Sequence, residues 1–229
     1  MTKPRSARRK YNPGDPAPAD HALADPARLE ILRAAAELFM DLGFTATTID
    51  AIAERLGATK GRVYHYFSSK AEIYFDVQRL AMTRLLAAIE PIAREPGSAR
   101  SRLEHMARAH VDIILRELPI QKVSVHGVEL HLFAASAARY TAEVRSIIHL
   151  RDEYEQLFAE VIDAGTREGD FVDLPPRLLS KAFFGPLNWV TYWYRPRKLQ
   201  TEADLEAIAT ALTEFAMRGI TRPREERSE

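Results

Sequence analysis

The segment 58–70 contains no acidic residue, and its side chains combine positive charge, hydroxyl groups and aromatic rings. Arg62 and Lys60 can bind guanine acceptors or phosphates, and Tyr64 and His65 can reach a phosphate or a thymine methyl. A helix of eight residues is roughly 12 Å long, which suits the DNA major groove. The alternative is a solvated face of an unrelated helical hairpin. The segment thus predicts a DNA-reading helix with exposed Thr59, Lys60, Gly61, Arg62, Tyr64 and His65.

A second distinctive segment covers residues 183–198. Both tryptophans of the chain, Trp189 and Trp193, lie four residues apart there and hence on one helical face. An aromatic wall followed by cations suits a ligand with an apolar part and an anionic head. We expect a medium- to long-chain or steroid-derived acyl-CoA, with its phosphates bound by Arg195, Arg197 and Lys198.

The same aromatic residues are also typical of a dimer interface, and a basic stretch is often a solvated loop. The last helix carries Leu205, Ile208, Leu212 and Phe215 at spacings of three and four residues. Two helices of this kind per subunit would form a four-helix interface in a homodimer. The alternative is packing within one subunit, so the sequence leaves pocket and interface open for 183–198.

Enzymatic and metal chemistry find little support in the sequence. The chain has no cysteine, which excludes disulfides, zinc-thiolate sites and thiol nucleophiles. His126, Glu129 and His131 carry ligating groups, but their spacing is not that of a recognised ligand set, and a polar or packing role is favoured. Neither a glycine-flanked serine elbow nor a phosphate-cradling glycine loop occurs. We expect no enzyme, no metal site and no cofactor.

A helix-turn-helix over residues 48–67 would position the DNA-reading segment 58–70. Thr48 can cap the first short helix and lie beside a backbone phosphate. Gly57 permits the tight turn, and Val63 packs the second helix onto the first. Lys70, at the start of the next helix, would add a further phosphate contact.

The whole chain has 229 residues, of which 46% are hydrophobic and 28% charged, with 32 basic against 32 acidic residues. It reads as all-α, because helical periods recur without two-residue alternation. A basic disordered arm (1–24) precedes a three-helix head (25–70), a helical ligand-binding and dimerisation body (71–220) and a disordered tail (221–229). No signal peptide or membrane span is visible, so we expect a cytoplasmic protein. Helices are predicted at 26–42, 48–56, 59–66, 70–94, 100–118, 121–134, 138–168, 176–194 and 202–219.

The runs 31–39, 43–49 and 57–67, together with Ile52-Ala53 and Lys70, resemble the DNA-binding head of the TetR/AcrR family of transcriptional regulators. The resemblance implies a homodimeric all-α repressor that leaves its operator when a small molecule binds the C-terminal body. Arg62 departs from the small or polar residue common at that position. The resemblance assigns DNA contacts to Thr48, Thr59, Lys60, Gly61, Arg62, Tyr64, His65 and Lys70.

A shorter pattern, Asn188-Trp189 with Trp193-Tyr194-Arg195-Pro196, resembles the branch of that family that responds to acyl-CoA esters. It implies that Asn188 joins the ligand-binding residues. We therefore expect a ligand-responsive repressor that binds a pseudo-palindromic DNA operator as a homodimer. The competing class is a helical binding or scaffold protein without operator-specific DNA binding, which the acid-free segment 58–70 disfavours.

Overall fold

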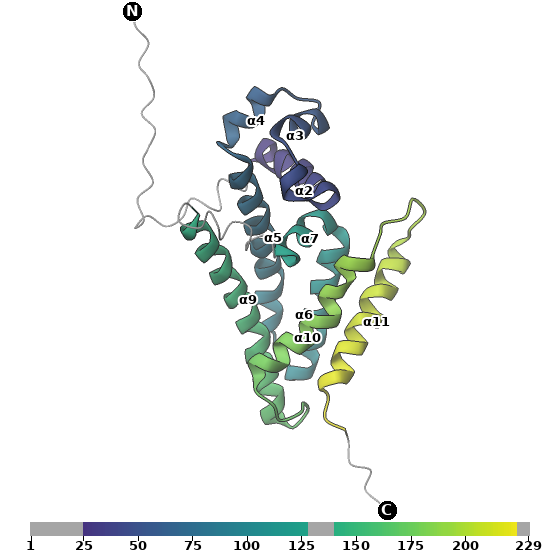
Figure 1. The fold of residues 1–229 in the computed structure, drawn as a ribbon. Helices are drawn as coiled ribbons and strands as arrows, with labels where there is room; N and C mark the ends of the chain where they lie inside the picture. The colour runs from purple at the N-terminus through teal and green to yellow at the C-terminus, as the bar shows by residue number, and fades with distance from the viewer. Residues whose placement is uncertain (1–24, 128–139, 224–229) are drawn as a thin grey trace, which may run out of the picture.

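The computed structural model describes residues 25–127 and 140–223, and over these residues the chain forms nine helices. The only pairing of extended backbone in this part of the chain is an isolated bridge between Phe171 and Thr221. Three of these helices form a head at one end of the molecule, and the other six form a body beneath it (Figure 1). The all-α prediction is therefore confirmed. The predicted arm and most of the predicted tail lie outside the described residues.

The head consists of α2 (Pro26–Ala46), α3 (Ile49–Arg55) and α4 (Lys60–Tyr66). The Asp25 side chain caps α2 by accepting a hydrogen bond from the Ala27 backbone N–H at 2.9 Å. Near the end of α2, Gly43 leaves the helical conformation with φ 78°. Gly57 turns the chain between α3 and α4 with φ 60°, in the left-handed region that favours glycine. The predicted caps and turns thus hold in the structure.

Six helices form the body: α5 (Lys70–Ala93), α6 (Ala99–Arg116), α7 (Leu118–Val125), α9 (Thr141–Glu168), α10 (Pro176–Trp193) and α11 (Glu202–Ile220). The boundaries of α7 differ from the predicted helix at 121–134. A proline is tolerated in the first helical turn, so α7 begins three residues earlier, at Leu118. It ends at Val125, and residues 128–134 lie outside the described part of the chain.

Two hydrophobic cores share α5. The head core packs residues of α2, α3 and α4 against the first half of α5, and it also takes in Ile120 and Val123 of α7. The body core begins at Met82 on α5 and gathers residues from α6, α9, α10 and α11. Because one continuous helix enters both cores, a change in the body can reach the head through rigid structure.

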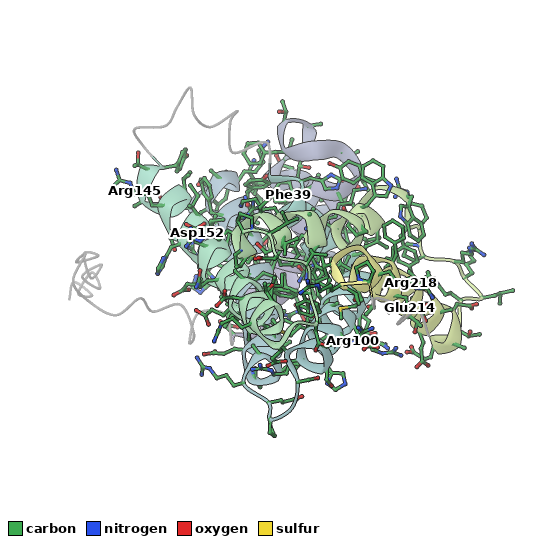
Figure 2. The ribbon with its side chains drawn as sticks, turned by 90° about the horizontal axis from the view of Figure 1, so that it is seen from below. Phe39, Arg100, Arg145, Asp152, Glu214 and Arg218 are labelled. Atoms are coloured by element: carbon green, nitrogen blue, oxygen red, sulfur yellow. The ribbon has the colours of Figure 1, made fainter. Side chains whose placement is uncertain are left out.

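Charged side chains cover the outside of the body. In Figure 2, Arg145 and Asp152 on α9 point outward on one side, and Glu214 and Arg218 on α11 point outward on the other. None of the described helices has the length and apolar character that a bilayer crossing would need.

Candidate nucleic-acid interface and ligand cavity

The predicted DNA-reading residues form an exposed surface on α4 and at the start of α3. Thr48, Thr59, Lys60, Gly61, Arg62, Tyr64 and His65 are all exposed, with Tyr64 at 49%. The Thr48 hydroxyl accepts a hydrogen bond from the Ala51 backbone N–H, and the Thr59 hydroxyl accepts one from that of Arg62. Both threonines therefore fix the start of a helix while their side chains remain at the surface.

Two acids outside the acid-free segment partner its cations. Lys60 donates to Asp50 on α3 at 2.9 Å, and this hydrogen bond raises the pKa of Lys60. Arg62 donates to Glu30 on α2 at 3.0 Å. Both pairs are exposed, so each contributes little to stability and can open at low cost. Sequence reasoning missed these acids, because they are distant in the chain and approach only when the helices cross.

Gly61 has no structural reason to be glycine in the free protein. Its backbone is helical, and a Cβ built there would approach nothing outside the helix more closely than Thr59 Oγ1, at 3.8 Å. Glycine inside a helix costs roughly 1 kcal/mol relative to alanine. Because glycine has no side chain, it allows a partner molecule to approach the α4 backbone closely.

Lys70 differs from the other predicted DNA contacts, because its charged group binds backbone carbonyls of the head. Its ammonium group donates to the backbone carbonyls of Phe44, Thr45 and Thr47 at 2.5, 3.1 and 2.6 Å, and it lies 4.4 Å from the centre of the Phe44 ring. The side chain therefore holds the end of α2 against the start of α5. The carbonyls freed by the break at Gly43 explain this placement, which the sequence did not indicate.

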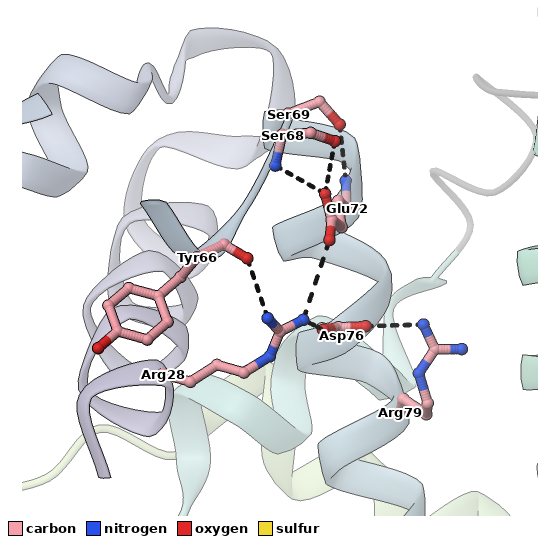
Figure 3. A network of polar contacts seen from close by, with 7 residues as sticks. All are labelled: Arg28, Tyr66, Ser68, Ser69, Glu72, Asp76 and Arg79. Atoms are coloured by element: carbon pink, nitrogen blue, oxygen red, sulfur yellow. Dashed lines mark hydrogen bonds and ion pairs between the residues drawn. The ribbon is translucent and has the colours of Figure 1, made fainter. Parts of the chain in front are cut away.

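A buried ion-pair network fixes the end of α4 on the rest of the head (Figure 3). Arg28 on α2 donates to the Tyr66 carbonyl at 3.0 Å, stacks over the Phe67 ring at 4.1 Å and pairs with Asp76 on α5. Arg79 pairs with the other oxygen of Asp76 at 2.7 Å. The network orients the exposed residues of α4 by joining three helices.

The body contains a cavity of about 170 Å³ lined by residues of α5, α6, α7, α9 and α10. The cavity is open to the surface, so a bound ligand can extend beyond it. On its wall, the Phe184 ring packs against Phe158 with the two centroids 4.6 Å apart. The medium- to long-chain or steroid-derived acyl group expected from the sequence would extend through the opening, and its identity stays a prediction. The apolar walls are Met82, Leu85, Val125 and Phe184, and polar groups come from His110, Ser124, Arg151, Tyr154, Glu155 and Asn188.

A chain of hydrogen bonds runs along the cavity. The Asn188 side-chain oxygen accepts from His110 Nε2 at 3.1 Å, so His110 Nδ1 accepts from the Tyr154 hydroxyl at 2.7 Å. Burial lowers the pKa of His110 to about 4, partly opposed by the bond to Asn188, so the ring is neutral at pH 7. The Asn188 amide nitrogen donates to no described residue and remains available at the cavity.

The aromatic and cationic residues predicted to bind ligand lie elsewhere, apart from Asn188. Trp189 and Trp193 are 59% and 47% exposed and are absent from the cavity wall. They do share a helical face, but the buried face of α10 is the one that carries Leu187 and Val190. The cations Arg195, Arg197 and Lys198 lie exposed in the loop after α10, where Arg195 donates to the Tyr192 and Tyr194 carbonyls.

His126 serves a packing role. Its Nε2 donates a hydrogen bond to the Thr191 hydroxyl at 2.9 Å, because that hydroxyl donates its own proton to the Asn188 carbonyl, and its ring stacks on the Tyr192 ring at a centroid distance of 4.1 Å. Glu129 and His131, considered with it as ligands, lie outside the described residues. Among the described residues no group of three metal-ligating side chains converges.

Comparison with known proteins identifies the family. The model described as "Tetracyclin repressor-like, C-terminal domain" matches residues 96–220, and the model "Bacterial regulatory proteins, tetR family" matches residues 31–77. The chain belongs to the TetR family. The two matched ranges cover most of the head, the first eight residues of α5 and the body from α6 to α11, and they leave residues 78–95 between them. It is therefore a ligand-responsive, DNA-binding transcriptional regulator that acts as a homodimer, and not an enzyme.

Individual relatives cover nearly the whole chain. The transcriptional repressor KstR2 of Rhodococcus jostii is 28% identical over 211 residues, which span 91% of this chain and 98% of that protein. The TetR regulator PfmR of Thermus thermophilus has a TM-score of 0.70 at 28% identity and covers 84% of this chain and 99% of its own. The structure of AibR with isovaleryl coenzyme A and operator DNA matches in fold, with a TM-score of 0.64 at 20% identity over 82% of this chain and 97% of that chain. These matches decide against a scaffold protein without DNA binding.

Proposed function

We propose that this TetR regulator is a repressor that leaves its operator when an acyl-CoA thioester binds the cavity in the body. The observation that carries the proposal is the cavity itself, in which apolar walls surround the free amide nitrogen of Asn188. That nitrogen can donate to the carbonyl oxygen of a thioester, and the apolar walls take its acyl chain. A short acyl group such as hexanoyl fits the cavity, and a longer chain would extend through its opening.

The cations at the end of α10 suit the phosphates of such an effector. Asn188 lies five residues before the end of α10 at Trp193, a rise of about 7.5 Å, and two non-helical residues lead on to Arg195, so a long ligand lying along the end of α10 reaches both. Lys122 on α7 lies close enough to Arg195 that its pKa is lowered, first by burial and then by the Arg195 charge. A phosphate bound between Lys122 and Arg195 would relieve the repulsion between these two positive charges. We propose Arg195, Arg197 and Lys198 as phosphate ligands, with Trp193 beside them.

The names of similar proteins support this class of effector. One fold relative, AibR, was solved with isovaleryl coenzyme A and operator DNA. Another relative, a "Fatty acid metabolism regulator protein" of Bacillus subtilis, is 22% identical over 85% of this chain. An acyl thioester is the chemistry that these names and the cavity have in common.

Helix α7 connects the cavity to the head. Val123 packs in the head core, whereas the next two residues, Ser124 and Val125, line the cavity. An effector that displaces Ser124 therefore shifts a segment on which α2 rests. It releases DNA only if it binds the DNA-free arrangement more tightly, since equal affinity for both states shifts nothing.

The DNA-bound state uses the exposed face of α4. We propose that Arg62, Lys60, Tyr64 and His65 read the major groove and that Thr48, Thr59 and Gly61 approach the backbone. The large exposed apolar residues of α10 and α11, including Trp189 and Phe215, form the face that a second copy covers. The resulting dimer presents two copies of α4 to a pseudo-palindromic operator in the cytoplasm.

The test is operator release measured by fluorescence anisotropy with labelled DNA from the region upstream of the gene. Hexanoyl-CoA is expected to raise the operator Kd at least tenfold, and hexanoate alone to act poorly. The triple variant Arg195→Gln, Arg197→Gln, Lys198→Gln should lose the preference for the ester, whereas Arg218→Gln, exposed on α11, should keep it. Equal release by acid and ester would overturn the role of the cations and leave the aromatic segment as interface alone.

A further inference from the structure

Arg151 on α9 is a largely buried cation without a carboxylate partner among the described residues. Its one hydrogen bond there is to the backbone carbonyl of Ser124 on α7. Burial lowers the pKa of the guanidinium, which nevertheless stays charged at pH 7. A partly desolvated charge paired only with a neutral carbonyl is costly, and a carboxylate on a ligand would offset that cost.

A buried polar side chain without a hydrogen-bond partner lies close to Arg151. Gln78 on α5 is fully buried, and neither its side-chain oxygen nor its nitrogen has a hydrogen-bond partner. A Cβ built on Gly127 would lie 2.8 Å from Arg151 Nη2 and 3.1 Å from Gln78 Oε1. Gly127 therefore lies directly against both groups, and a larger residue there would displace the guanidinium. Gln78 and Gly127 are not part of the cavity wall, so the member of this cluster that a ligand in the cavity meets is Arg151.

The position of Arg151 in the cavity sets which part of a ligand it meets. Arg151 lies one helical turn before Tyr154, and Tyr154 is joined through His110 to Asn188. Arg151 and Asn188 both line the cavity, and the hydrogen-bonded chain Tyr154–His110–Asn188 connects the two helices that carry them. A ligand whose thioester carbonyl binds Asn188 directs the far end of its acyl chain toward Arg151.

Glu155 is the acidic residue of the cavity wall, and it already has a cationic partner. It pairs with Lys181 at 2.8 Å and also accepts from the Ser180 hydroxyl at 3.3 Å. No ion pair joins it to Arg151, although the two lie four residues apart on α9. The guanidinium therefore keeps its capacity for a bidentate partner.

We infer that Arg151 is the subsite for a carboxylate at the far end of the effector's acyl chain, so that the preferred effector is a dicarboxylic acid monothioester. The inference rests on the cavity being the effector site. A saturated alkyl end would desolvate the guanidinium without pairing it, whereas a carboxylate accepts two parallel N–H bonds from it. This contact would therefore make the site bind a chain that ends in a carboxylate more tightly than an alkyl chain of equal length.

The experiment compares six-carbon ligands by calorimetry without DNA: adipoyl-CoA against hexanoyl-CoA, and adipate against hexanoate. The wild-type protein is expected to bind each dicarboxylate at least tenfold more tightly than its monocarboxylate partner. Arg151→Gln should abolish this preference. Arg145→Gln, which removes an exposed arginine of the same helix, should retain it.

Gly127→Ala provides a second variant in which the charge remains. Its Cβ would crowd Arg151 Nη2, so the preference for adipoyl-CoA should fall while binding of hexanoyl-CoA persists. Equal binding of the two chain types by wild type, a preference that survives in Arg151→Gln, or no binding by any of the four compounds would overturn the inference. Failure of the proposed function is distinct, because it appears as ligand binding that leaves operator affinity unchanged.

Discussion

At Gly61, an alanine Cβ meets nothing closer than 3.8 Å outside the helix in the free protein. Gly61→Ala is therefore expected to raise the free energy of unfolding by about 0.5–1 kcal/mol, because alanine loses less backbone entropy in a helix. If DNA approaches the α4 backbone at this point, the same methyl group should weaken operator binding about tenfold. Urea unfolding and fluorescence anisotropy measure the two effects.

Gly219→Ala is the matched control, since Gly219 is an exposed helical glycine of α11 with no neighbour within 4 Å of a built Cβ. It should stabilise the protein without changing operator affinity. Operator binding by Gly61→Ala as tight as that of wild type would remove Gly61 from the DNA interface.

His110 makes the stability of the body depend on pH. Its pKa is about 4 in the folded protein and about 6.5 in the unfolded chain, so the unfolded state binds more protons between these values. The contribution of His110 is fully present above pH 6.5 and is lost as the pH falls toward 4. About 2 kcal/mol should disappear between pH 7 and pH 5. Urea titrations should show a shallower pH dependence for His110→Gln, and an unchanged dependence would contradict the neutral, buried state.

Among the head elements, Arg28 joins α2, the end of α4 and α5, whereas Arg79 forms an ion pair with Asp76 on its own helix. Arg28→Ala breaks a buried pair and should cost about 3 kcal/mol of unfolding free energy. Because the Tyr66 carbonyl and the Phe67 ring lose their partner as well, operator affinity should also fall. Arg79→Ala should leave operator affinity near wild type. Equal effects of the two changes on DNA binding would show that the network does not orient α4.

The helix elements could be predicted from sequence because their signals are local. Caps such as Thr48, turns such as Gly57 and apolar periodicity need only neighbouring residues, and the exposed face of α4 follows from them. The cavity could not be predicted in this way, since its lining comes from five helices. Arg151 gave no signal, because its distinguishing property, the lack of a carboxylate partner within residues 25–127 and 140–223, appears only in the folded structure. Trp189 and Trp193 showed a shared face, but which face of α10 is buried depends on tertiary packing.

At the scale of the whole molecule, the apolar surface of α10 and α11 predicts dependence on a second copy. Phe215 is 69% exposed in one protomer. Phe215→Glu would place a charge in the covered face and should shift sedimentation from dimer to monomer at micromolar concentration, with loss of cooperative operator binding. Arg145→Glu, on the opposite side of the body in Figure 2, should remain dimeric. If Phe215→Glu remained dimeric, the dimer interface would have to lie elsewhere on the molecule.

The central claim is that one molecule couples effector binding in the body to DNA binding in the head. Linkage requires this coupling to be reciprocal, so the factor by which the effector weakens operator binding is the factor by which operator weakens effector binding. The most direct measurement is the calorimetric Kd of hexanoyl-CoA for the protein alone and for the protein saturated with operator. We predict a Kd about tenfold higher in the presence of operator. The same Kd with and without DNA would contradict the claim.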